Sequence, residues 1–150
     1  MTLRRHYWDK AARLPYECEI GTSDVDAGVL LEVAIDGEPV RVYRGLDFED
    51  ALQALRADFE SRERLLLVNR FRQNACVSSL SRQMSHGLRC YLVEPRRPVD
   101  PSTLVNCLDP APESEVVTEA EARAFIARWQ SQAPWHVRFP LVRWLSRLRD

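Results

Sequence analysis

Apolar and polar residues alternate along VLLEVAIDGEPVRVY, which runs from position 29 to position 43. Alternation with a period of two is typical of a strand that buries one face. The central Asp36-Gly37 pair is a strong hairpin signal, because a tight turn needs residues that tolerate positive φ. The pattern therefore predicts two antiparallel strands at 29–35 and 39–44.

The apolar spacing changes to three and four residues immediately after this hairpin. In LDFEDALQALRADFESRERL the apolar side chains share one helical face, and they are Leu46, Phe48, Ala51, Leu52, Leu55 and Phe59. Asp47 suits the N-cap, and Glu49 and Asp50 follow in the first turn, where the helix dipole favours anions. The pattern predicts a helix over 47–61.

Shorter apolar runs follow, and a second amphipathic helix comes after them. Three runs, LLLVNRF, LRCYLVE and LVNCLD, predict strands at 64–70, 87–94 and 104–108. Thr118 with Glu121 three residues later is a capping-box pattern ahead of apolar residues at helical spacing. This pattern predicts a helix over 119–132.

The order of these elements predicts an α+β fold in a single domain that spans residues 1–150. We expect an antiparallel or mixed sheet of about five strands, two main helices and a short C-terminal amphipathic helix. The first 28 residues show no clear period, so we expect them to be mostly irregular. A chain of this length buries roughly 70% of the surface of its unfolded form, so we expect it to fold without a metal or a disulfide.

The predicted C-terminal helix lies in FPLVRWLSRLRD. Its apolar stripe consists of Leu141, Trp144, Leu145 and Leu148. Arginines and Ser146 occupy the opposite side. The favoured interpretation is a terminal helix that docks its stripe on the sheet, beginning at Pro140. A basic amphipathic helix also suits an anionic membrane surface or the groove of a partner.

Charge is distributed unevenly along the chain. Residues 1–121 carry a net charge of −6 and residues 122–150 a net charge of +5, within a total of −1. A partner would therefore meet two different faces.

No apolar run follows the N-terminal arginines, and no window reaches the length of a membrane span. We expect a cytoplasmic protein that binds neither membrane nor nucleic acid, because the overall balance is acidic.

The densest group of reactive side chains lies in NACVSSLSRQMSHGLRCYLV, residues 74–93. A thiol nucleophile would need Cys76 activated by His86. The segment lacks the glycine-flanked serine of a serine-hydrolase elbow. It also lacks the closely spaced His and Cys residues of a zinc site and the glycine cluster of a phosphate-binding loop. We predict no catalytic residue, cofactor or metal, and we expect Cys76 and Cys90 to be buried free thiols.

The same segment is compatible with a structural turn. Residues 75–84 read as a helix with Val77, Leu80 and Met84 facing the core. Gly87 is expected in a left-handed conformation that ends this helix before the next strand. Ser81, Arg82, Ser85 and His86 are then expected to point outward, where they are available to a partner.

Residues 65–93 resemble small bacterial immunity proteins encoded beside polymorphic toxins. The shared pattern is a strand and turn, a Ser-Gly-Met-x-Arg-x-Met run, a glycine turn and a strand ending in Ala-Tyr. Arg82, Met84, Gly87 and Tyr91 fit it, whereas Asn69-Arg70, Ser79-Leu80 and Ser85-His86 depart from it. The resemblance covers about thirty residues. It implies a protein that binds and blocks a cognate toxin domain without chemistry of its own.

An inhibitor of this kind needs a partner-binding surface, and exposed acids would suit a basic toxin domain, because opposite charge speeds the encounter. The candidate partner-binding residues are Asp24, Asp26, Glu38, Ser81, Arg82, His86, Asp109, Glu113 and Glu115. Two alternatives stay open: a small cysteine-dependent enzyme that uses Cys76 and His86, and a non-catalytic adaptor that docks through its basic C-terminal helix.

Overall fold

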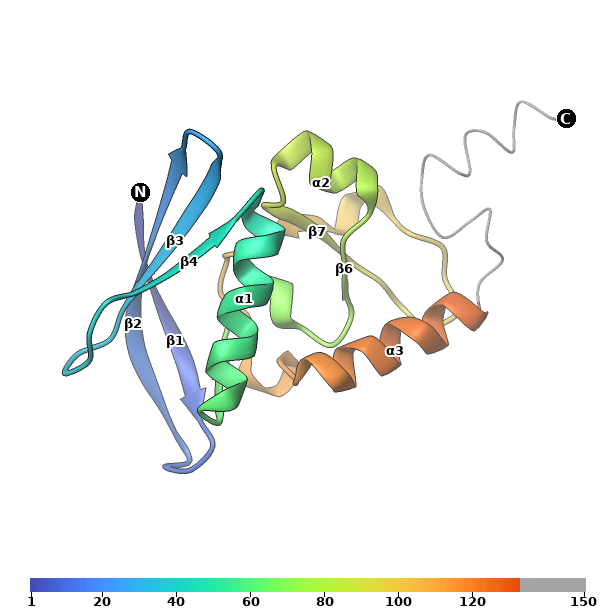
Figure 1. Cartoon of the computed structure of the whole chain (residues 1–150). Coiled ribbons are helices and arrows are strands. Elements are labelled where there is room, and N and C mark those ends of the chain that lie inside the picture. Colours follow the sequence, from blue (N-terminus) through green and yellow to red (C-terminus); the bar gives the residue numbers. More distant parts are fainter. Residues whose placement is uncertain (133–150) are drawn as a thin grey trace, which may run out of the picture.

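The structure of the protein, a computed structural model, describes residues 1–132. Its fold is α+β, as predicted, and its larger sheet has five antiparallel strands in the order β4-β3-β2-β1-β5 (Figure 1). These strands are β1 (Thr2–Asp9), β2 (Leu14–Val25), β3 (Gly28–Ala34), β4 (Arg41–Gly45) and β5 (Arg64–Leu66). Helix α1 (Phe48–Ser61) lies against one face of this sheet.

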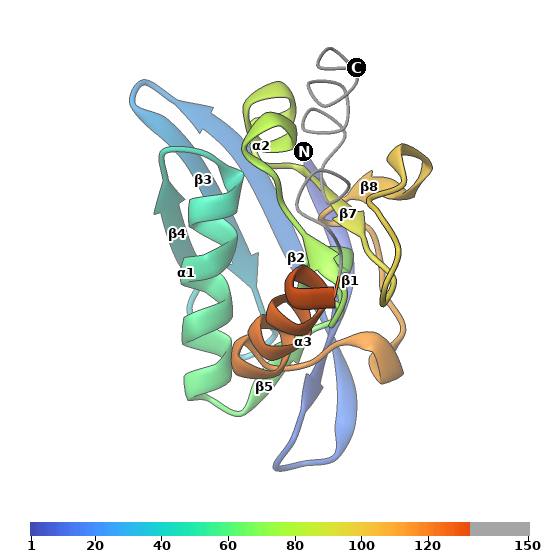
Figure 2. The same ribbon diagram turned by 90° about the vertical axis from the view of Figure 1, so that its right-hand side faces the viewer.

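A second, three-stranded sheet lies beside α1 and carries the other two helices (Figure 2). Its strands are β6 (Ala75–Cys76), β7 (Arg89–Leu92) and β8 (Leu104–Asn106), in the order β6-β7-β8. The helices are α2 (Ser79–Ser85) and α3 (Glu119–Gln132), and three short 3₁₀ turns are η1 (Asn69–Phe71), η2 (Pro101–Thr103) and η3 (Glu113–Glu115). The strands predicted at 87–94 and 104–108 are therefore present but shorter, and they belong to a separate sheet.

The expectation of an irregular N-terminus is wrong, because residues 2–25 form the long β1–β2 hairpin. Its inward positions carry Tyr7, Cys18 and Ile20, which are buried. The period was hidden because Arg5 also occupies an inward position. Its Nε donates to the carbonyl of Leu108, so a charged residue stands where the alternation calls for an apolar one.

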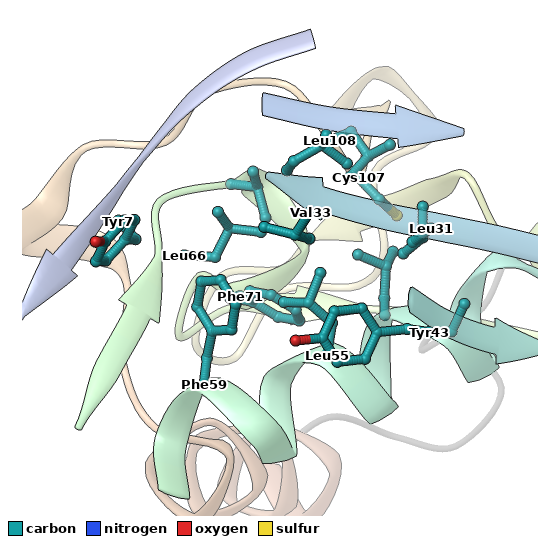
Figure 3. Packing of buried hydrophobic residues seen from close by; sticks show 14 of the residues in the cluster. Tyr7, Leu31, Val33, Tyr43, Leu55, Phe59, Leu66, Phe71, Cys107 and Leu108 are labelled. Carbon is teal, nitrogen blue, oxygen red and sulfur yellow. The ribbon is translucent and has the colours of Figure 1, made fainter. Parts of the chain in front are cut away.

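The core between the larger sheet and α1 is built as the apolar spacing predicts. Asp47 caps the helix and accepts a hydrogen bond of 3.0 Å from the Asp50 backbone N–H. Figure 3 shows Leu55 and Phe59 reaching from α1 into the buried cluster that the strands complete. The hairpin at Asp36-Gly37 is also confirmed, because β3 and β4 pair on either side of it.

The strand predicted at 64–70 is correct only in its first half. β5 ends at Leu66, and Asn69 begins the 3₁₀ turn η1. Asn69 is buried, its backbone N–H donates to the carbonyl of Asp109, and its side-chain amide donates to the carbonyl of Asn106. A buried polar side chain with these partners turns the chain toward the second sheet.

Helix α3 begins as its capping box predicts, because Thr118 Oγ1 donates to Glu121 Oε1 at 2.9 Å and accepts from the Glu121 N–H. Trp129 of α3 is buried in a second apolar cluster with Tyr91 and Val99. The C-terminal helix predicted at 140–150 lies outside the described residues. Among residues 1–132 no helix is both long and apolar enough to cross a membrane.

Candidate functional site

Helix α2, the centre of the segment singled out by the sequence, is held at its start by serine caps. The Ser81 backbone N–H donates to Ser78 Oγ at 3.0 Å, and the Ser78 N–H donates to Ser81 Oγ at 3.1 Å. Ser81 is 4% exposed. The prediction that Ser81 points outward is therefore wrong, because its hydroxyl is needed to satisfy the N-terminal backbone of α2.

The predicted helix at 75–84 is wrong in its first half, where Ala75–Cys76 form β6. Because the helix begins later, Ser81 rather than Met84 lies against the core. Met84 is 79% exposed, contrary to prediction, while Val77 and Leu80 are half-buried.

Arg82 joins α2 to the N-terminus of α1. Its guanidinium donates from Nε and Nη2 to the Asp47 carboxylate and from Nη2 to Asp50 at 2.5 Å. Burial alone would raise the pKa of Asp47, but the Arg82 guanidinium and the Asp50 N–H hold that pKa below its usual value. Arg82 is only 39% exposed, so much of it serves this contact instead of solvent.

The end of α2 packs directly on the start of α1. His86 and Gly87 both have positive φ, 56° and 83°, which confirms the left-handed ending predicted at Gly87. The carbonyl of His86 accepts from the Phe48 N–H at 3.0 Å. A Cβ on Gly87 would lie 2.5 Å from the Glu49 backbone nitrogen, so only glycine fits here without displacement.

His86 itself remains accessible at this end of the molecule. Its ring is 54% exposed, contacts Phe48 edge-on and lies 4.0 Å from the Asp24 carboxylate. Asp24 is an exposed residue near the end of β2, and Asp26 lies in the exposed turn between β2 and β3. The structure therefore brings Asp24 together with one of the residues predicted at the end of α2, His86. We call Asp24, Arg82, Gln83, Met84 and His86 the α2 surface.

The other predicted acids lie elsewhere. Glu38 is half-buried and already paired within the chain, because it contacts Arg62 and Arg64 at 3.0 Å, and its hydrogen bond with Arg64 lowers its pKa. Asp109, Glu113 and Glu115 are exposed in the segment between β8 and α3. Asp109 lies 3.8 Å from Arg5 of β1. The nine predicted residues thus fall into three groups on different elements.

Cys76 and Cys90 are buried free thiols, as predicted. Burial raises the pKa of the Cys76 thiol to about 11. The contacts of His86 are to Phe48 and Asp24 rather than to Cys76. A protonated, buried thiol without an adjacent base is a poor nucleophile.

We expect Cys76 in the folded protein to react with iodoacetamide near pH 8 at least ~100-fold more slowly than in urea. The raised pKa reduces the thiolate population by about this factor, and burial restricts access further. Mass spectrometry of timed, quenched reactions gives the rate for each cysteine. Selective labelling of Cys76 in the folded chain would instead support the cysteine-enzyme alternative.

The sequence did not reveal a set of charged side chains buried between α1 and η1. Arg70 donates two hydrogen bonds of 2.7 Å to the Glu49 carboxylate, and Gln53 donates a third at 3.0 Å. Arg56 stacks on the Phe71 ring and donates to the carbonyl of Val117. These groups make a charged layer beneath the apolar core.

A signal for this layer was present in the helix pattern. Glu49, Gln53 and Arg56 follow one another at spacings of four and three, which places them on a single stripe of α1. The stripe borders the apolar face, and residues on such a border become buried when another element covers them. The partner, Arg70, comes from η1, which the sequence had assigned to a strand.

Among residues 1–132 no group of three His, Cys, Asp or Glu side chains is arranged to hold a metal ion.

No model of a known protein family matches the chain, and a search of curated proteins finds no significant match.

Proposed function

We propose that this chain is an immunity-type protein of the bacterial cytoplasm, which binds a cognate toxin domain and covers its active site. The resemblance of residues 65–93 to such proteins supports this proposal. Arg82 and Gly87, two of the matching residues, make the contacts that fix α2 on α1.

The observation that carries the proposal is the exposure of Met84 on a helix whose base is fixed. Met84 is 79% exposed, and α2 is anchored on both sides of it by Arg82 and Gly87. A pre-positioned apolar side chain loses little conformational entropy on binding, and methionine adapts to irregular partner surfaces. Exposed Asp24 and His86 supply polar contacts at the same end of α2.

The exposed charges of this chain indicate which kind of partner would bind it. The exposed acids Asp24, Asp26, Asp109, Glu113 and Glu115 favour a basic domain. Complementary charge mainly raises the rate of association, while well-packed apolar anchors mainly lower the rate of dissociation. A toxin that acts on an anionic substrate, with a basic active site, fits this arrangement.

The direct test uses the genes adjacent to the one that encodes this chain. A neighbouring gene for a large secreted protein that ends in a small variable domain provides the candidate toxin domain. Expression of that domain alone should stop growth, and co-expression of this chain should restore growth through a complex that co-purifies. A toxic neighbour that this chain neither binds nor neutralises, or a metabolic operon in its place, contradicts the proposal.

Once the complex is available, two variants should affect its kinetics differently. Reversing Asp109, Glu113 and Glu115 to lysine should slow association several-fold and weaken its salt dependence. Met84→Ala should instead raise the dissociation rate about tenfold or more, if Met84 is an interface anchor. Both rates are measured by surface plasmon resonance at two salt concentrations.

A matched control tests whether the location of Met84 matters. Leu14 is also exposed, at 53%, but lies at the start of β2. Leu14→Ala should leave both rates unchanged. Equal effects from Leu14→Ala and Met84→Ala, or no effect from Met84→Ala, would remove α2 from the interface.

A further inference from the structure

Strand β4 forms one edge of the larger sheet and leaves backbone groups open along its outer side. β3 pairs with it on one side, and no strand of residues 1–132 lies on the other (Figure 2). An edge strand presents a row of N–H and C=O groups to which another strand can add. The register of the sheet determines which residues of β4 carry these groups.

The two-residue turn between β2 and β3 fixes this register. Val25 and Gly28 pair across the turn, and residues so close together can pair only by exchanging both of their backbone hydrogen bonds. Alternate residues of β3 therefore bond to β2, and the residues between them bond to β4. Leu31 is one of the latter, and its partner on β4 is Tyr43.

Val42 and Arg44, the neighbours of Tyr43, consequently direct their N–H and C=O groups away from β3. Among residues 1–132 no backbone group bonds to them from outside the sheet. The pairing of β4 with β3 contains no bulge, and residues 40–46 contain no proline. An added strand would therefore meet an uninterrupted edge.

The same short segment exposes apolar side chains. Three of the eight large hydrophobic residues exposed in the described part of the chain belong to it. They are Val40 at 59%, Val42 at 46% and Leu46 at 78%. Apolar side chains beside open backbone groups favour the addition of a strand whose own apolar residues cover them.

Arg44 supplies the charge that selects the added strand. Tyr43 and Arg41 both contact Asp58 of α1, so Val42 and Arg44 lie on the opposite face of the sheet. Arg44 is exposed, and it forms no ion pair with any residue of 1–132. Its guanidinium is therefore available to an acid on a neighbouring strand.

This charge favours a different protein over a second copy of the chain. A second β4 would bring two more arginines to the ladder and would leave Arg44 without an acid, because residues 40–46 contain none. A segment with an acid opposite Arg44 and an apolar residue opposite Val42 gains two favourable cross-strand pairs.

We infer that the open edge of β4 binds an extended segment of a protein partner. The segment pairs antiparallel with residues 40–46 and carries an acidic side chain opposite Arg44. The backbone ladder binds any extended chain, while Arg44 and the two valines select its sequence. The inference does not rest on the proposed toxin inhibition, because no residue of the α2 surface lies on β4.

The test uses the blocked peptide acetyl-Thr-Glu-Thr-Val-Thr-Val-Thr-amide. In antiparallel register its glutamate lies opposite Arg44, and its valines lie opposite Val42 and Val40. Titrated into the full ¹⁵N-labelled chain, it should shift the amide signals of Val42 and Arg44 saturably, with a Kd on the order of 1 mM. N-methylation of the peptide's central valine removes one donor of the ladder and should weaken binding at least about tenfold.

An exchange of charge tests the role of Arg44. Lysine in place of the peptide's glutamate should weaken binding to the parent chain about threefold, and Arg44→Glu should reverse this preference. Arg89→Glu is the matched control, because Arg89 is also an exposed strand arginine but lies on β7 of the other sheet. It changes the net charge equally and should leave both affinities unchanged. The Tm of each variant establishes that it folds.

Three results would overturn the inference. They are the absence of saturable shifts up to about 10 mM peptide, undiminished binding of the N-methylated peptide, and a preference that Arg44→Glu does not reverse. Shifts of the same amides on raising the protein concentration without peptide would also overturn it, because a second copy would then occupy the edge. None of these results bears on whether the chain neutralises a toxin.

Discussion

Glu49→Leu should destabilise the folded protein by about 3 to 5 kcal/mol, the cost of leaving a buried guanidinium without its counter-charge. Arg70 depends on Glu49 for both of its short hydrogen bonds, and these side chains are only 14% and 10% exposed. Urea denaturation followed by circular dichroism measures the change in the free energy of unfolding.

The double variant Glu49→Leu/Arg70→Met distinguishes two contributions to this loss of stability. One is the loss of the ion pair itself, and the other is the cost of burying Arg70 without its carboxylate. The double variant should recover most of the lost stability, to within about 1 kcal/mol of the parent chain, because neither charge is then buried. Glu119→Gln removes a partner from the exposed Arg123–Glu119 pair and should cost less than about 1 kcal/mol. A double variant no more stable than Glu49→Leu would show that the pair is not what the stability depends on.

Gly87→Ala should destabilise the fold by about 3 kcal/mol. Alanine is unfavourable in the left-handed conformation of this residue, and its Cβ would clash with the Glu49 backbone. Gly37→Ala supplies the matched control. Gly37 has nearly the same φ, 78° against 83°, but a Cβ there would meet nothing within 4 Å. Gly37→Ala should therefore cost only the backbone term, about 1 kcal/mol.

The difference between the two glycine variants measures how closely α2 packs on α1. Thermal unfolding of both variants in the same buffer gives this difference directly. Equal destabilisation would mean that the end of α2 moves away from Phe48 and Glu49 at little cost. The α2 surface would then lack the rigidity on which the proposed function depends.

Local signals in the sequence predicted the parts of the fold that local chemistry determines. The hairpin at Asp36-Gly37, the Asp47 cap and the Thr118 capping box depend on residues within a few positions of one another. Such contacts form wherever the chain places the right residue types in order.

The failures share a different cause, which is pairing between distant segments. Arg5 lies inward because the carbonyl of Leu108 is there to accept from it, and Asn69 is buried because Asn106 and Asp109 meet it. Neither partner is visible from the neighbouring sequence. For the same reason the sequence indicated the charged stripe on α1 but not its partner, Arg70.

The candidate site was predicted in part. His86 lies beside Asp24, and Arg82 binds Asp47 and Asp50. Ser81, however, serves the cap of α2, and Glu38 pairs with arginines. An exposed position and a capping position look alike in a serine-rich stretch. Only the point at which the helix begins distinguishes them, and that point depends on β6 pairing with β7.

The β1–β2 hairpin extends beyond β3, the strand that pairs with the other edge of β2. β3 pairs with β2 only from Glu19 onward, and the connection from β3 to β4 turns away (Figure 1). The first residues of β2 therefore present a strand edge to which a second copy of the chain could add. Pro15 cannot donate to an added strand, and Glu17 brings a charge to the edge. Pro15 and Glu17 thus disfavour the pairing of this exposed edge of β2 with the same edge of a second chain.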